Sequence, residues 1–358
     1  MIIAKAVNSL KQSASRLAVN NKGGILIISL WSLCLLSIFA LNLGYGVRQK
    51  IILVQRLDER SKLHFIAVSG VKSAIVSLKK EGEEETDIEK MYDSLSDGWS
   101  DNMGAFKDIQ VGDGTFSVSY DYIDERADLL LTRYGLIDEE RKININKIDQ
   151  TVLRDLFRNV LDFNEIESQE LAASIVDWRD SDSELSIALG SAEDYDYRTL
   201  TYPYEAKDAE IEVLEELLLV KGMSVEFLNK LRDYITIYGD GKININTASK
   251  DVFLALGLDR FLAEKILLFR KGEDGVITTP DDNIFEQPSN IVSDLSQYSH
   301  LSEFEVAELN RVVDRYLGTK SDHFMVKSVA KLNNKRNTTE VICVINRNGK
   351  ILYWHEEP

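Results

Sequence analysis

The chain has 358 residues, 44% of them hydrophobic, and a formal net charge of −17 from 42 basic and 59 acidic side chains. This length and hydrophobic content suffice for two or three packed domains and exclude a wholly disordered protein. The acidic balance argues against non-specific DNA binding, because such proteins must neutralise the phosphate backbone. Two cysteines, Cys34 and Cys343, are too few for a disulfide framework or a cysteine-based metal knuckle.

An apolar segment lies close to the N terminus. Residues 24–47 contain no charged side chain and exceed the ~20 residues that a helix needs to cross a bilayer. We therefore predict that they form a transmembrane segment. The preceding residues carry four basic side chains and no acidic one, at Lys5, Lys11, Arg16 and Lys22. Because basic flanks stay in the cytoplasm, the N terminus is predicted inside and the rest of the chain outside.

The junction before this segment resembles the prepilin-peptidase site of type IV pilins and pseudopilins. Lys22 and Gly23 precede the apolar run, and in that superfamily the cut leaves the apolar helix on the mature protein. The resemblance implies a leader of residues 1–23, cleaved between Gly23 and Gly24; a cut after Gly24 would move the register by one. A conventional signal peptide is not expected, because its apolar region would be shorter, about 7–15 residues. The alternative to a cleaved leader is an uncut signal anchor.

The helical pattern continues past the apolar segment. A stripe of apolar side chains recurs at helical spacing from Ala67 to Leu78. We predict one helix from Gly24 to about Lys79, with its second half packed on a sheet. The acidic stretch Glu81–Asp87 is predicted to end the helix as a solvated loop.

Strand patterns flank the middle of the chain. Alternating or β-rich segments are found at 115–120, 129–136, 324–332, 339–345 and 350–354. Asn348-Gly349 between the last two is a strong hairpin signal. The regions that contain them, 48–146 and 321–358, are predicted to form one α+β domain.

Residues 147–320 have helical patterning with few strand signals, which predicts a large all-α insertion in that domain. The expected helices are 152–160, 165–179, 212–220, 224–234, 250–256, 260–270 and 302–316. A five-residue motif at 142–146 recurs identically at 242–246, so the insertion should contain two related helical units. The motif asparagines are expected to cap the next helix, through Asn246 or Thr247 in the second copy, rather than to bind a ligand.

Several motifs together resemble the K-type minor pseudopilins of the type II secretion system. They occur in order at 92–95 with Trp99, 142–146, 173–182, 190–195, 213–223 and 238–248. The resemblance implies a pilin-like α+β fold, in which the long N-terminal helix packs on an antiparallel sheet, with a large all-α insertion. It further implies a non-enzymatic subunit at the tip of the periplasmic pseudopilus that initiates its assembly for protein export.

The same resemblance implies partners and a location. The partners are the I- and J-type minor pseudopilins, the major pseudopilin and prepilin peptidase, with no nucleic acid. The location is the bacterial inner membrane, with a cytoplasmic N terminus and a periplasmic C-terminal domain. Pilins usually carry Glu at the fifth mature position, where this chain has Ile28. A subunit with no neighbour above it has no amine to pair with that carboxylate, so Ile28 fits a tip position.

Seven carboxylates lie within the twenty residues 177–196. Hard oxygen ligands at this density suit Ca²⁺, and the resemblance implies calcium here in some members. The candidate ligands are Asp177, Asp180, Asp182, Glu184, Glu193 and Asp194. The spacing is not that of an EF-hand, and a solvated acidic loop is the alternative.

Other functions have weaker support. A carboxylate pair for glycoside chemistry cannot be identified by spacing, and the four histidines have no metal-ligand spacing. Residues 245–266 resemble a helix-hairpin-helix unit of a membrane-tethered DNA-binding protein, but Asp259 stands where the second hairpin glycine would be and should repel phosphate. A minor pilin of a related type IV pilus system remains a further alternative.

Overall fold

The computed structural model describes residues 21–83, 92–124, 129–188, 190–333 and 335–357. The chain divides into two compact units, Met1–Lys62 and Leu63–Pro358. Apart from its last three residues, the predicted leader lies outside the described residues. The predicted domain boundaries at 47, 146 and 320 stay predictions.

The predicted N-terminal helix is confirmed as α2, Asn21–Glu83. It begins three residues before Gly24 and continues through Glu81, Gly82 and Glu83, so the prediction of a loop starting at Glu81 was wrong. Glu and Lys are good helix formers, and acidic composition alone therefore does not end a helix. The remainder of the predicted loop, residues 84–87, lies outside the described residues.

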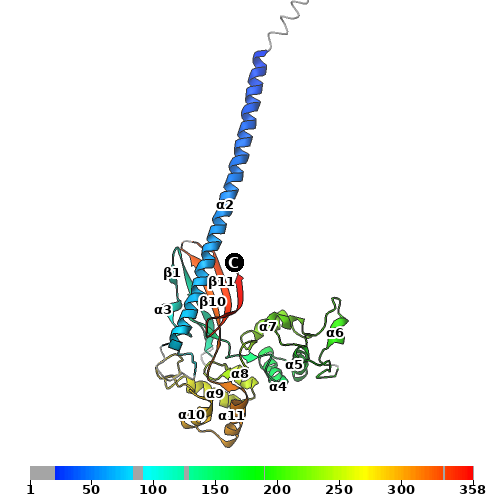
Figure 1. Cartoon of the computed structure of the whole chain (residues 1–358), viewed down its shortest axis with the longest axis vertical. Coiled ribbons are helices and arrows are strands. Elements are labelled where there is room, and N and C mark those ends of the chain that lie inside the picture. The colour runs from blue at the N-terminus through cyan, green and yellow to red at the C-terminus, as the bar shows by residue number, and fades with distance from the viewer. Residues whose placement is uncertain (1–20, 84–91, 125–128, 189, 334, 358) are drawn as a thin grey trace, which may run out of the picture. The chain divides into compact units, whose positions relative to one another are not determined.

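An antiparallel sheet forms the other layer of the pilin-like part (Figure 1). Its strand order is β1-β2-β10-β11-β12, and β5 pairs with the N-terminal end of β10. The bounds are β1 Ile109–Val111, β2 Gly114–Val118, β5 Ile137–Asp138, β10 His323–Leu332, β11 Thr338–Asn346 and β12 Ile351–Glu357. The α+β fold class is confirmed.

The C-terminal half of α2 packs on this sheet through small side chains. Ala67 and Ala74 are fully buried in the core that the helix and the sheet share. A Cβ atom added at Gly70 would lie 2.1 Å from Ser328 Oγ on β10. Ser328 Oγ in turn donates a hydrogen bond of 2.9 Å to the Ala67 carbonyl. The helix backbone thus approaches the central strand too closely for any side chain at residue 70.

The first predicted strand divides in two. β2 ends at Val118, and β3, Tyr120–Asp124, pairs instead with β4, Leu129–Arg133, in a separate hairpin. The physical reason lies in β10, which pairs with β2 through Ser328–Leu332 but with β5 at Phe324–Met325. Because β5 occupies the same edge of β10, the chain after β2 must leave the sheet. The C-terminal hairpin is confirmed, with Gly349 at φ +80°.

Helices fill the insertion, most of them close to their predicted bounds. A short helix, α3 Met103–Phe106, precedes the insertion. The others are α4 Gln150–Leu161, α5 Glu165–Arg179, α6 Asp194–Arg198, α7 Val225–Leu231, α8 Lys250–Ala255, α9 Arg260–Arg270, α10 Ile291–Tyr298 and α11 Glu303–Tyr316, with 3₁₀ turns η1 Leu214–Leu219 and η2 Pro288–Asn290. The prediction of an α-helix at 212–220 was wrong. Leu217 is buried but Leu218 and Leu219 are partly exposed, so this apolar run lacks a consistent α-helical face.

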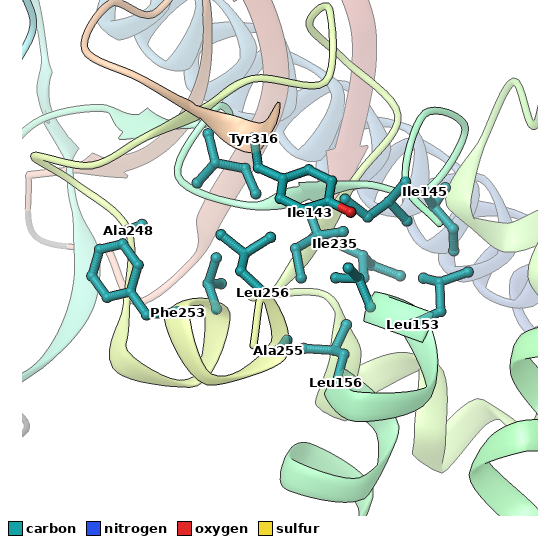
Figure 2. Packing of buried hydrophobic residues seen from close by; sticks show 14 of the residues in the cluster. Ile143, Ile145, Leu153, Leu156, Ile235, Ala248, Phe253, Ala255, Leu256 and Tyr316 are labelled. Carbon is teal, nitrogen blue, oxygen red and sulfur yellow. The ribbon is translucent and has the colours of Figure 1, made fainter. Parts of the chain in front are cut away.

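Each copy of the repeated motif begins one of two helical units within the insertion, and the two helical units have the same strand pairing. In the first, β6 (Ile143–Asn144) pairs in parallel with β7 (Ile235–Thr236). In the second, β8 (Ile243–Asn244) pairs in parallel with β9 (Leu317–Gly318). Each unit therefore closes on its first strand after its last helix. Their buried side chains form one continuous core, and Figure 2 shows Leu156 of the first unit near Ala255 of the second.

The predicted capping role of the motif asparagines was wrong. The N-cap positions of α4 and α8 are Asp149 and Ser249, and neither makes a side-chain cap hydrogen bond. Asn146 instead exchanges two hydrogen bonds, each of 2.9 Å, with the backbone of Ile211. Asn246 makes the same pair of bonds, also at 2.9 Å, with the backbone of Phe285. Each side-chain amide therefore pairs with a backbone segment as a neighbouring strand would, and it fixes the long connection within its own helical unit.

Asp138 joins the insertion to the sheet. Its carboxylate Oδ2 accepts hydrogen bonds from Thr247 Oγ1 at 2.5 Å, Ser321 Oγ at 2.8 Å and Asn244 Nδ2 at 3.2 Å. Asp138 is 1% exposed, and burial together with the charge of Glu140 raises its pKa. One buried side chain on β5 therefore connects the second helical unit and the chain that returns to β10.

Asn246→Ala should lower the free energy of unfolding by about 2 kcal/mol or more, because it leaves a buried backbone N–H and C=O of Phe285 without partners. The measurement is chemical denaturation of residues 48–358. Asn310→Ala is the control, since its exposed side chain bonds only Val306 of its own helix and the change should stay within about 0.5 kcal/mol. Equal effects of the two substitutions would contradict the stabilising role of the bonds between Asn246 and Phe285.

Candidate functional site

The apolar segment of α2 is exposed along its length. Within the described residues, α2 is the one helix long and apolar enough to cross a membrane, and its most apolar window has a mean hydropathy of 2.5 with no part buried. Ile28 is 68% exposed. Gly23 and Gly24 lie in the first turns of the helix. The structure thus leaves this segment free to contact lipid or other helices.

The acidic cluster is built at the end of α5 and the start of α6. Asp177 and Asp180 lie in the last turn and at the C-cap of α5, and Glu193 is the N-cap of α6. Asp177 is fully buried, and both its carboxylate oxygens accept from the Ser186 backbone N–H, at 3.1 and 3.2 Å. The loop between the helices is therefore tied to α5 by one of the predicted ligands.

The carboxylates of the cluster disfavour one another's ionisation. Burial, together with the charges of Asp177, Asp180 and Asp208, raises the pKa of Glu193 to about 7, against the lowering effect of a hydrogen bond from the Asp194 backbone N–H. Burial, then the charges of Asp182 and Asp177, also raise the pKa of Asp180. The site therefore holds more negative charge than its protein surroundings stabilise.

Two carboxylate oxygens in the cluster have no hydrogen-bond partner. They are Oδ1 of Asp180 and Oε1 of Glu193, and both are buried. Glu193 as a whole is 5% exposed. Unsatisfied buried carboxylate oxygens are rare in proteins and are the donor type that Ca²⁺ takes. The chemistry of these residues fits a hard cation, although no three His, Cys, Asp or Glu side chains of the described ranges are already arranged to hold one.

The other predicted ligands are placed differently. Asp194 bonds Arg198 at 2.8 Å and the Ala206 backbone N–H at 3.0 Å. Asp182 Oδ1 accepts from the Glu184 backbone at 2.9 Å, in an exposed turn. The structure thus groups Asp177, Asp180 and Glu193 and commits Asp194 to structural contacts.

Asp208 was missed by the sequence reasoning. It follows α6 by ten residues, and its backbone N–H donates to the Trp178 carbonyl at 3.1 Å. Its φ of +51° is left-handed, a conformation that Asp tolerates better than most residues. No local spacing connects Asp208 to Asp177, so only the fold could add it to the cluster.

The helical hairpin of the second unit is also formed as predicted. Gly257, at φ +85°, turns the chain between α8 and α9. Asp259 caps α9, and its carboxylate accepts from the Phe261 backbone N–H at 2.8 Å. The carboxylate therefore occupies the helix N-terminus at which a phosphate would bind, which disfavours the DNA-binding alternative.

Comparison with known proteins shows what this chain is similar to. Residues 131–240 match the family model described as type II secretion system protein K. The predicted resemblance to the K-type minor pseudopilins is confirmed. The protein K match covers the first repeated motif and the acidic cluster, and it ends just before the second motif copy at 242–246.

One curated protein and one solved structure are similar to this chain. The chain is 24% identical over 199 residues to type II secretion system protein K of Aeromonas hydrophila, a match covering 54% of this chain and 55% of that protein. The chain thus spans about half the length of that curated relative. The fold is similar to a chain in the crystal structure of the GspK-GspI-GspJ complex of the enterotoxigenic Escherichia coli type 2 secretion system, with a TM-score of 0.60 and 17% identity over 85% of this chain and 99% of that one.

Proposed function

We propose that this protein K chain is a non-enzymatic minor pseudopilin that initiates assembly of the type II secretion pseudopilus at its tip. The observation that carries the proposal is the division of α2, whose residues 24–47 are apolar and exposed while residues 63–78 complete the core of a sheet. Residues 24–47 are available to the membrane and to neighbouring helices. Residues 63–78 belong to the folded unit, which we call the head. The similar complex supports partners of the I and J types.

The tip position rests on Ile28. A carboxylate at lipid depth is costly unless a cation meets it, and a subunit at the tip has no neighbour above to supply one. An apolar residue at this point removes the need for that partner. The large helical insertion then forms the leading part of the head, and the membrane orientation is N terminus in the cytoplasm and head in the periplasm.

Prepilin peptidase is expected to remove residues 1–23 and to leave Gly24 as the first residue. The physical basis is that the basic flank precedes a helix that must stay on the mature protein. N-terminal mass spectrometry of the protein from cells with the peptidase tests this. A product that still starts at Met1, or that starts beyond Val47, would refute the pseudopilin assignment.

Ile28→Glu should weaken assembly with the I- and J-type subunits, because it places an unpaired carboxylate in lipid at a cost of a few kcal/mol. Co-purification with both partners and secretion by a complemented strain are the measurements. Ile28→Leu is the matched control and should leave both unchanged. Full recovery of partners and of secretion by the Glu variant would argue against the tip position.

We further propose that the acidic cluster binds calcium. Asp177, Asp180, Glu193 and Asp208 would supply the oxygens, and Asp182 lies close enough to influence Asp180. The bound ion would neutralise the charges that now oppose one another and would hold the 180–193 loop on α5. The role is structural, since it fixes one side of the helical insertion.

Calcium should raise the thermal midpoint of residues 48–358. At a hundredfold excess of calcium over its Kd, the free energy of unfolding should rise by about 2.7 kcal/mol. The gain should be smaller at pH 5.5 than at pH 7.5, because the pKa of Glu193 near 7 means that calcium must displace its proton at the lower pH. Asp180→Ala with Asp182→Ala should abolish the gain.

The control for the calcium experiment is Asp233→Ala with Asp314→Ala, which removes two exposed carboxylates outside the cluster. This double variant should respond to calcium like the parent protein. If calcium does not change the thermal midpoint of the parent protein, the calcium proposal is wrong and the cluster is a solvated acidic loop. A response that survives loss of Asp180 and Asp182 would locate the ion elsewhere.

A further inference from the structure

A group of basic side chains follows the membrane segment directly. Arg48, Lys50 and Arg56 come before the first acidic residue of the chain, Asp58. All three are exposed on α2. We refer to these three residues as the basic collar. Its charge contrasts with residues 63–358, which hold 33 basic and 57 acidic side chains and a net charge of −24.

The collar surrounds the helix instead of marking one face. At 100° per residue, Arg48, Arg56 and Lys50 fall at about 0°, 80° and 200° around the axis. A protein partner docks on one side and would select charges within one sector. A shell of lipid headgroups contacts the helix from every direction, and the distribution of the collar fits this second kind of partner.

Apolar side chains alternate with the collar along the axis. Ile51, Leu53, Val54 and Leu57 are between 53% and 64% exposed. Long basic side chains with apolar neighbours are typical of the membrane interface, where the stems lie along the acyl boundary and the charged ends reach the phosphates. Arg48 and Arg56 are eight residues apart, about 12 Å along the helix, which is comparable with the depth of a headgroup layer.

We propose that Arg48, Lys50 and Arg56 bind the anionic phosphate headgroups of the bilayer that residues 24–47 cross. The inference rests on the proposed membrane anchoring of that segment. It assigns the turn after Val47 to the lipid interface, while the acidic folded unit is repelled from the same surface. The collar thus holds the anchor at a defined depth until the subunit is drawn into the pseudopilus.

The test uses the full chain in lipid nanodiscs and an uncharged, water-soluble maleimide. Leu53→Cys places a reporter thiol inside the collar. Its labelling should be severalfold slower in discs with about 30% phosphatidylglycerol than in pure phosphatidylcholine, and about 1 M salt should remove the difference. Arg48→Gln, Lys50→Gln and Arg56→Gln together should also remove it. Removing the same charge with Lys72→Gln, Lys79→Gln and Lys80→Gln, at exposed positions of the same helix, should not.

The native thiols separate failure of the collar from failure of the anchor. Cys343 is fully buried and should not react with the maleimide. Cys34 lies in the apolar segment and should react only after detergent is added. Equal labelling of Leu53→Cys in both kinds of disc, with Cys34 protected, would overturn the collar alone. Labelling of Cys34 in intact discs would overturn the anchor and the collar together.

Discussion

The close contact between α2 and β10 is the constraint on which the pilin-like part depends. β10 pairs with β2 and β5, which precede the insertion, and with β11, which follows it. Gly70 and Ser328 bring the helix backbone against the middle of this strand. A bulkier residue at either position would separate the helix from the sheet. The core that residues 63–78 share with the sheet would then open.

A second constraint operates where the insertion leaves the sheet. Asp138 bonds Thr247, Asn244 and Ser321, which belong to the second helical unit and to the chain returning to β10. Arg347, the residue that follows β11, bonds the buried carboxylate of Asp93 at 2.5 Å. Asp138, Asn244 and Asp93 are buried, so removal of one of their partners leaves a buried polar group without compensation. Such a junction favours one arrangement of insertion and sheet over looser alternatives.

The sequence was most informative where periodicity is strong. The predicted bounds of α9 and α11 agree with the structure to within one residue, and Asp259 and Ser302 cap these two helices. Sequence reasoning was weaker where the structure depends on distant partners. The division of β2 from β3 is decided by β5, and the role of Asn246 is decided by Phe285, 39 residues away. In the acidic cluster, density of charge identified Asp177, Asp180 and Glu193, but Asp208 enters only through a backbone contact to α5.

The pairing of β5 with β10 also has a kinetic consequence. Phe324 meets Asp138 across nearly two hundred residues, and such long-range pairing is slow because a large loop must close before any contact forms. The insertion has its own core, built largely from contacts between neighbouring helices. If it folds first, it brings its own two ends together, as the hydrogen bond of 2.9 Å from Glu139 N–H to the His323 carbonyl indicates. The folded insertion would then shorten the search of the flanking strands for one another, and its own folding rate would limit how quickly the sheet can close.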